Sequence, residues 1–186
     1  HGTSKKLSKH LHLPVQSGSN RILKLMKREY TREQFLYLIA AFRKHIPLMT
    51  FMTDIICGFP SETDEEFEES LQLIKASKIN FLNCSKFFSR PNTRAAKLPQ
   101  LNSKILKART LKLTRSFAQL DQKQNQAWLN WTGTALVDEQ EDGFFIARND
   151  SYMPVVVKNK NLRIGERVQI SITESKARYL IGRIAR

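Results

Sequence analysis

Strand-like and helical patterns alternate over the first hundred residues, and this alternation limits the folds open to the chain. The apolar run at 48–57 has the length and β-branched content of a strand buried on both faces of a parallel sheet. Shorter strand-like runs lie at 11–15 and 79–88, with helical segments between the strands. Such an order predicts right-handed parallel βαβ units. Because a closed (β/α) barrel takes about 200 residues or more, we expect these strands to be part of one.

Local start signals support the helices. Ser19 or Asn20 is a natural N-cap for a helix that follows. The segments 31–34 (TREQ) and 63–66 (TDEE) read as capping boxes, each placed before a stripe of apolar residues at helical spacing. Three acids in the turn that follows Thr63 also suit the positive end of a helix dipole.

The pattern changes after Trp128, where short alternating segments replace long helices. Five short strands at such spacing predict a small antiparallel β-barrel. Glycine and asparagine turns separate the segments, which span 132–138, 144–148, 154–158, 166–173 and 177–184. We therefore expect an α/β half-barrel at 1–100, a basic linking helix at 101–127, and a five-stranded β-barrel at 128–186.

The net charge is +14 and is spread unevenly. Residues 1–125 carry 22 Lys and Arg against 10 Asp and Glu, whereas residues 126–186 carry 9 against 7. The stretch 86–123 holds ten basic residues and one acid. Such a stripe indicates a polyanionic partner, and a lysine-rich solvated helix face is the alternative.

The two cysteines, Cys57 and Cys84, stand in apolar strand-like runs. Their spacing is not that of a secreted disulfide framework, and two isolated cysteines cannot build a metal site. We expect two buried, reduced thiols in a cytoplasmic protein. No apolar stretch reaches the roughly 20 residues of a membrane span, and the polar, basic N-terminus lacks the apolar region of a signal peptide.

Function in parallel βα folds lies in the loops at the carboxyl ends of the strands. Three such loops are rich in small and polar groups, at 16–19, 54–62 and 89–93. Taken singly, each is more often a simple turn. Asp54 and Glu62 are expected to serve the structure, through hydrogen bonds inside the barrel or as a cap of the next helix.

In this order the loops resemble the signatures of the radical S-adenosylmethionine methylthiotransferases. The matching segments are 12–20 (HLPVQSGSN), 26–31 (MKREYT), 53–63 (TDIICGFPSET) and 88–96 (FSRPNTRAA). The C-terminal region is similar to a TRAM domain at 143–149 (GFFIARN), 152–157 (YMPVVV) and 179–182 (YLIG). The resemblance covers almost the whole chain, from about residue 10 to the end.

The resemblance implies a [4Fe-4S] cluster that reductively cleaves S-adenosylmethionine, chemistry that no side chain supplies. Gln16 and Ser17 are the candidates for the ribose and amino-acid head, and Gly18 for a close backbone approach. The adenine pocket would include Ile56, Gly58 and Phe59, with Gly58 leaving room for the base. No catalytic side chain is assigned.

One departure from the family is important. The family holds its cluster with a C-x3-C-x2-C motif and a second cluster with three further cysteines, and neither set occurs in this chain. On its own the chain is therefore expected to bind no metal and to be inactive, as a fragment of a longer enzyme. The alternative is a stand-alone, non-catalytic RNA-binding protein whose half-barrel is a remnant of such an enzyme.

The TRAM resemblance implies tRNA as the partner, since basic residues neutralise phosphates and aromatic rings stack on unpaired bases. The expected contacts are Arg90, where a salt bridge is the alternative, and Arg148, Tyr152, Lys158 and Arg178. An electron donor is the other expected partner, and the protein is expected to be a monomer.

Three segments resemble the archaeal and eukaryotic enzymes that act on N6-threonylcarbamoyladenosine: 131–133 (WTG), 136–139 (LVDE) and 152–157. Relatives that act on isopentenyladenosine or on a ribosomal-protein aspartate are the alternatives. The strong basic charge favours RNA over a protein substrate.

Overall fold

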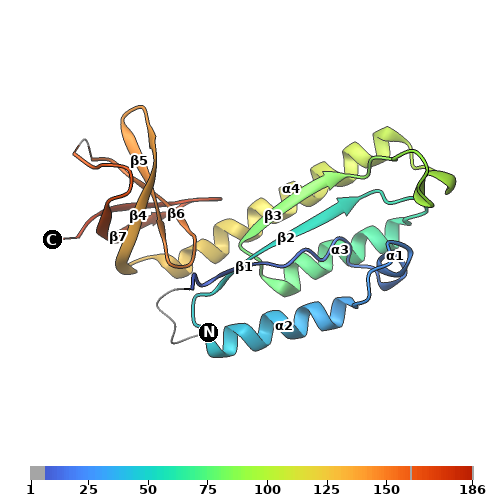
Figure 1. Ribbon diagram of the computed structural model, residues 1–186, viewed down its shortest axis with the longest axis horizontal. Helices are drawn as coiled ribbons and strands as arrows, with labels where there is room; N and C mark the ends of the chain where they lie inside the picture. The colour runs from blue at the N-terminus through green and yellow to red at the C-terminus, as the bar shows by residue number, and fades with distance from the viewer. Residues whose placement is uncertain (1–6, 160, 186) are drawn as a thin grey trace. The chain divides into compact units, whose positions relative to one another are not determined.

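The computed structural model describes residues 7–159 and 161–185, which fall into two compact units (Figure 1). The first, here called the α/β unit, consists of His12–His45 and Phe51–Phe117. The second, here called the barrel unit, consists of the described residues from Ala118 onward, Ile46–Thr50, and the described residues up to Leu11. No helix within the described ranges is long and apolar enough to cross a membrane.

Strands and helices alternate in the first part of the chain, as the sequence predicts. The elements are β1 (His10–His12), α1 (Asn20–Leu25), α2 (Arg32–His45), β2 (Thr50–Cys57), α3 (Asp64–Ser77), β3 (Phe81–Lys86), the short 3-10 helix η1 (Ala95–Lys97) and α4 (Ser103–Asn125). Figure 1 shows the three strands side by side, in the order β1-β2-β3. The strands β2 and β3 are parallel, with Asp54 opposite Asn83 and Ile56 opposite Ser85.

The start signals read from the sequence are confirmed. Ser19 caps α1, because its side chain accepts a hydrogen bond from the backbone N–H of Ile22. Thr63 and Glu66 form a complete capping box at the start of α3. The predicted pair at α2 also forms, since Thr31 N–H donates to the Gln34 side chain at 2.8 Å.

The two faces of β2 differ in exposure. Phe51, Ile55 and Cys57 lie on one face and are at most 1% exposed, whereas Asp54 and Ile56 on the other face are only partly buried. The expectation of a strand buried on both faces is therefore wrong for the second face.

Helices account for the buried face of β2. On α2, the ring of Phe42 lies 6.3 Å from that of Phe51, measured between centroids. On α4, Thr110 lies beside Cys57. We call the opposite face, which carries Asp54 and Ile56, the open face of the sheet.

The second part of the chain forms the closed β-barrel that the sequence predicts. After the 3-10 helix η2 (Gln126–Trp128), its strands are β4 (Thr132–Glu141), β5 (Phe144–Asn149), β6 (Pro154–Val157), β7 (Arg167–Ser175) and β8 (Leu180–Ile184), in the order β4-β5-β6-β8-β7. The barrel is mixed rather than wholly antiparallel, because β6 and β8 are parallel. The remaining neighbours are antiparallel.

Small and branched apolar residues fill the barrel, among them Val137, Val155 and Ile170, each fully buried. Gly182 lies in this core, where an added Cβ would stand 2.5 Å from a methyl carbon of Ile170. The interior therefore has no room for a side chain at this position.

Candidate active site

The carboxyl ends of the three strands meet at one edge of the sheet, as parallel pairing requires. Gln16, just after β1, forms an isolated parallel bridge with Ile55 of β2. Its backbone N–H donates to Asp54 O at 2.8 Å, and its carbonyl accepts from Ile56 N–H at 2.9 Å. The first predicted loop is thereby fixed beside the second.

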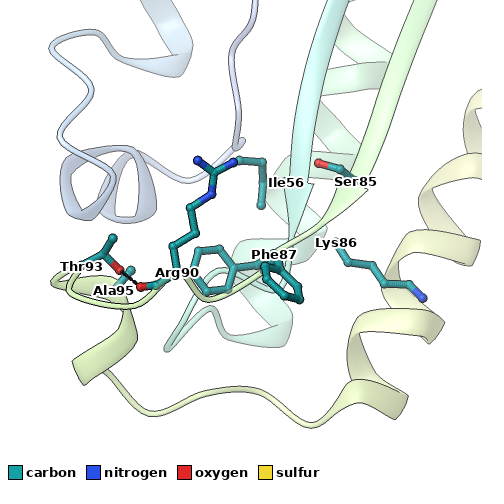
Figure 2. A pocket seen from close by; sticks show the side chains of 8 residues that line it. Ile56, Ser85, Lys86, Phe87, Arg90, Thr93 and Ala95 are labelled. Carbon is teal, nitrogen blue, oxygen red and sulfur yellow. Dashed lines mark hydrogen bonds between the residues drawn. The ribbon is translucent and has the colours of Figure 1, made fainter.

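A cavity of about 390 Å³ lies at this edge (Figure 2). It begins at Ile56 on β2 and extends along the end of β3 into the loop that follows. Its wall consists of Ile56, Ser85, Lys86, Phe87, Phe88, Arg90, Thr93 and Ala95. The second and third predicted loops thus contribute to one hollow.

Arg90 is the prominent cation of this cavity. Figure 2 shows its guanidinium group extending towards Ile56, away from the loop backbone that carries it. The loop is held by Thr93, whose hydroxyl donates to Arg90 O at 2.8 Å. Within the described residues, no carboxylate lies close enough to form an ion pair with Arg90. The salt bridge considered as an alternative is therefore not present there, and the guanidinium is available for an anion.

The two polar residues of the first loop differ in availability. Ser17 is fully buried, and its hydroxyl oxygen accepts a hydrogen bond from Ser19 N–H at 3.2 Å. The Gln16 side chain is 9% exposed and makes no hydrogen bond to any other described residue. Gln16 is therefore the better placed of the two for a ligand.

Both predicted glycines approach protein rather than open space. An added Cβ at Gly18 would stand 2.4 Å from Ser70 Cα of α3, and Gly18 N–H donates to Ser70 Oγ at 2.8 Å. At Gly58, which has a φ of +77°, an added Cβ would stand 2.7 Å from Leu106 of α4. Each glycine lets a helix pack against a site loop, and the space beside Gly58 is filled by a leucine.

Phe59 supports the cavity from behind. Its ring is 6% exposed and meets the ring of Phe87 edge to face, with 5.2 Å between centroids. Because Phe87 lines the cavity, this contact ties the loop after β2 to the loop after β3.

A buried ion pair fixes the loop after β2. Glu62 is 3% exposed, and its carboxylate accepts from Arg109 of α4 at 2.6 Å and from Gly58 N–H at 2.9 Å. Burial raises the pKa of the Glu62 carboxyl, while the N–H of Gly58 and the charge of Arg109 oppose that rise. The expectation that Glu62 serves the structure agrees with these contacts.

Sequence reasoning missed Arg109, which is only 6% exposed. It belongs to the basic stretch 86–123, in which the sequence does not distinguish a buried arginine from the exposed lysines and arginines around it. Its second nitrogen also donates to Asp64 at 2.7 Å, at the start of α3. The one available signal was its helical spacing from the buried residues Leu113 and Phe117.

In the barrel unit, the structure brings two of the predicted RNA contacts together. The guanidinium of Arg148 lies 4.8 Å from the centre of the Tyr152 ring. It also forms ion pairs with Asp138 and Glu139, each at 2.5 Å. Its charge is thus already balanced by protein.

The other two predicted RNA contacts are separate from this pair. Lys158 and Arg178 have exposed side chains with no ion pair to any described residue. The backbone N–H of Arg178 donates to the buried Asp121 of α4. This bond fixes the loop. The charge of the exposed Arg178 guanidinium opposes the rise that burial causes in the pKa of Asp121, and the group remains accessible to an anion.

Comparison with known proteins agrees with both parts of the architecture. Residues 4–74 match the radical SAM superfamily, and residues 132–185 match the TRAM domain. Coproporphyrinogen III oxidase from Escherichia coli, a radical SAM enzyme, has a similar structure with a TM-score of 0.52. The match covers 88% of this chain and 38% of that one at 19% identity, so it shows the fold alone. The chain thus contains a radical SAM region followed by a TRAM domain.

Relatives with higher identity narrow the family. A protein from Archaeoglobus fulgidus named probable threonylcarbamoyladenosine tRNA methylthiotransferase is 37% identical over 98% of this chain and 43% of its own length. The human threonylcarbamoyladenosine tRNA methylthiotransferase is 36% identical over 92% of this chain and 30% of its own length. A tRNA-2-methylthio-N(6)-dimethylallyladenosine synthase from Pelotomaculum thermopropionicum is 36% identical over 96% of this chain and 41% of its own length.

The chain is similar to radical SAM methylthiotransferases over most of its length, which confirms the resemblance read from its motifs. It spans less than half the length of these curated relatives.

Proposed function

We propose that this chain is part of a cytoplasmic tRNA methylthiotransferase that adds a methylthio group to C2 of N6-threonylcarbamoyladenosine in the anticodon loop. Residues 1–100 would form half of the catalytic barrel, 101–127 the linking helix and 128–186 the RNA-binding domain. The observation that carries the proposal is the similarity, over 92–98% of the chain, to relatives named for this reaction. The cavity at the carboxyl edge of the sheet is the proposed site of this reaction.

The residues at this edge suit S-adenosylmethionine. The ligand carries a carboxylate, which the unpaired guanidinium of Arg90 suits, and polar groups, which the Gln16 amide suits. Ile56 and Phe87 offer an apolar wall for its adenine, supported from behind by Phe59. When bound and reductively cleaved, S-adenosylmethionine supplies an organic radical that removes hydrogen from an unreactive carbon. The part of this chain is to bind and orient it.

The residues present do not suit the iron–sulfur cluster. The chain has two cysteines, and no group of three metal-binding side chains occurs in the described residues. A [4Fe-4S] cluster needs more thiolates than this. We therefore assign this chain no step at the cluster, and neither the cluster nor its electron donor is given a site here.

The barrel unit would hold the tRNA. Lys158 and Arg178 carry exposed side chains that can neutralise phosphates. The half-exposed ring of Tyr152 is stacked on the ring of His10, with 4.9 Å between centroids, and would offer its exposed part to a base. Arg148 would act with Tyr152, because its guanidinium already lies against that ring.

A second candidate substrate is isopentenyladenosine in tRNA. The observation in its favour is the 36% identity to the dimethylallyladenosine synthase, which nearly equals the identity to the threonylcarbamoyladenosine enzymes. A non-catalytic RNA-binding protein is the third possibility.

One experiment separates these functions. The gene is deleted in its natural source, and the nucleosides of total tRNA are quantified by liquid chromatography and mass spectrometry. We expect 2-methylthio-N6-threonylcarbamoyladenosine to vanish while N6-threonylcarbamoyladenosine accumulates. Loss of the isopentenyl derivative instead would establish the second candidate. An unchanged nucleoside profile would overturn both and leave an RNA-binding role.

A further inference from the structure

The open face of the sheet carries a polar row that crosses all three strands. His12 of β1 lies beside Asp54 of β2, with 3.0 Å between His12 Nε2 and Asp54 Oδ2. Asp54 is in register with Asn83 of β3, so all three side chains share one face. His12 and Asn83 are exposed.

Such a row is unusual for a parallel sheet, whose strands are normally apolar on both faces. The opposite face of β2 follows that rule, with Phe51, Ile55 and Cys57 buried. Histidine, aspartate and asparagine on one face do not form an apolar layer. They provide hydrogen-bonding groups to whatever occupies that side of the sheet.

The hydrogen bond between His12 and Asp54 determines which atom is left for a ligand. A carboxylate oxygen can only accept, so Nε2 of His12 must carry the proton of this bond. In the neutral ring, Nδ1 is then an acceptor. No described residue bonds to Nδ1, and the side chain is 45% exposed. Asp54 thus acts as an orienting group, as carboxylates do for histidines in many sites.

The row is continuous with the cavity at the carboxyl edge. One step of two residues along the strands leads from Asp54 and Asn83 to Ile56 and Ser85, both of which line the cavity. That step is about 6.6 Å, at 3.3 Å per residue. A ligand the size of a nucleoside can therefore reach from one to the other.

We propose that His12, oriented by Asp54 and flanked by Asn83, makes a hydrogen bond through Nδ1 to a nucleoside on the open face. The inference rests on the proposed function and extends its site from the cavity into the sheet. The nucleoside is either S-adenosylmethionine or the adenosine of the tRNA, because both present amino or hydroxyl donors. His12 is the residue that contacts the ligand, and Asp54 is a positioning residue.

Two substitutions of His12 separate contact with a ligand from support of Asp54. In His12→Gln the terminal amide replaces Nε2, which keeps the bond to Asp54 and removes the group at Nδ1. In His12→Asn the amide replaces Nδ1 and the bond to Asp54 is lost. His45→Gln, at the exposed end of α2, is the matched control.

The natural full-length holoenzyme is assayed in two ways. Equilibrium dialysis measures the Kd for radiolabelled S-adenosylmethionine, and filter binding compares anticodon stem-loops with and without threonylcarbamoyl-adenosine. We expect His12→Gln to raise the Kd in one of these two assays by about tenfold, the usual effect of losing one hydrogen bond in a ligand site. His12→Asn should weaken the same one by less than about threefold, and His45→Gln should change neither.

The assay that responds identifies the ligand. A higher Kd for S-adenosylmethionine assigns the row to the cofactor, whereas a lost preference for modified RNA assigns it to the substrate. Asp54→Asn should weaken binding as much as His12→Gln does. The amide of the new asparagine donates to Nε2 of His12, so the ring proton moves to Nδ1, which can then no longer accept a hydrogen bond from the ligand. Wild-type behaviour of His12→Gln in both assays, or a greater defect in His12→Asn, would overturn the inference. If the wild-type holoenzyme itself binds neither ligand, the proposed function fails instead.

Discussion

Cys57 and Cys84, on the neighbouring strands β2 and β3, hold their sulfur atoms 3.6 Å apart. The sequence gives no hint of this pair, because 26 residues separate the two cysteines along the chain. The two thiols are both free but differ in access, since Cys57 is fully buried and Cys84 is partly exposed. The hydrogen bond between them, with burial, raises the pKa of Cys57, and the same bond lowers the pKa of Cys84.

We therefore predict that Cys84 is alkylated first. With iodoacetamide at pH 8, one adduct should form on Cys84 in the folded protein, because only the more acidic and accessible thiol presents a thiolate. Peptide mapping by mass spectrometry gives the site and the rate. Cys57 should react only after denaturant is added. Equal rates for both in the folded protein would contradict the pair geometry.

Removal of Arg109 should strongly destabilise the protein. Arg109→Met leaves the Glu62 carboxylate buried without its partner, at a cost of about 3–5 kcal/mol. Urea unfolding followed by circular dichroism measures it. The control is Lys112→Met on the same helix, whose ion pair with Glu68 is exposed and contributes about 1 kcal/mol or less. Equal effects of the two variants would show that the buried pair has no special role.

Glu66 should make stability depend on pH in the acid range. The hydrogen bond from Arg21 lowers the pKa of Glu66 to about 2, against burial. An unfolded glutamate titrates near about 4.3. Its ionised form therefore stabilises the fold above that pH, and this contribution is lost as the pH falls towards 2. Urea midpoints measured from pH 6 to pH 2.5 should fall less steeply for Glu66→Gln than for the wild type.

Gly182→Ala should destabilise the barrel unit through overpacking. The new methyl would stand 2.5 Å from Ile170 and 2.8 Å from Val155, both fully buried. Forcing such contacts costs about 1–3 kcal/mol. Thermal unfolding monitored by near-ultraviolet circular dichroism is a suitable measurement. Arg183→Ala, at the exposed next position of β8, is the control and should leave the melting temperature within a degree or two.

Lys158 and Arg148 should contribute differently to RNA affinity. Each free cation that meets a phosphate adds about one unit to the slope of log Kd against log salt. Lys158→Gln should therefore lower that slope by nearly one. Arg148→Gln should lower it much less, because Asp138 and Glu139 already balance the charge. Filter binding between 50 and 300 mM salt gives both values, and identical slopes would contradict the distinction.

Local patterns in the sequence predict local structure well here. The Thr63 capping box and the strands of the barrel depend on neighbours in the chain, and the structure confirms them. Contacts between distant segments were not predictable. Periodicity cannot tell which face of β2 helices will cover, that Arg109 turns inward, or that β6 pairs in parallel with β8.

The candidate site follows the same division. The loops around Gln16, Gly58 and Arg90 were found from motif order, and the structure joins the last two through Ile56, Phe59 and Phe87. Gly18 and Gly58 were expected to leave space for a ligand, but each packs against a helix. The sequence could not predict this, because the contacts with α3 and with Leu106 of α4 depend on how distant segments pack. The row of His12, Asp54 and Asn83 could not be predicted from the sequence either, because only the register of the strands brings these residues side by side.

The closure of the barrel has a kinetic consequence. The first strand of the barrel, β4, pairs with the fourth, β7, so that Thr132 lies opposite Ser171. The third strand, β6, gains its second neighbour only when β8 has been added. No pair of adjacent hairpins can therefore complete the core alone. We expect the barrel unit to assemble late and in one cooperative step, because long loops must close before the stabilising contacts form. During synthesis, the outer edge of β4 would stay unpaired until β7 has left the ribosome, and the outer edge of β6 until β8 has.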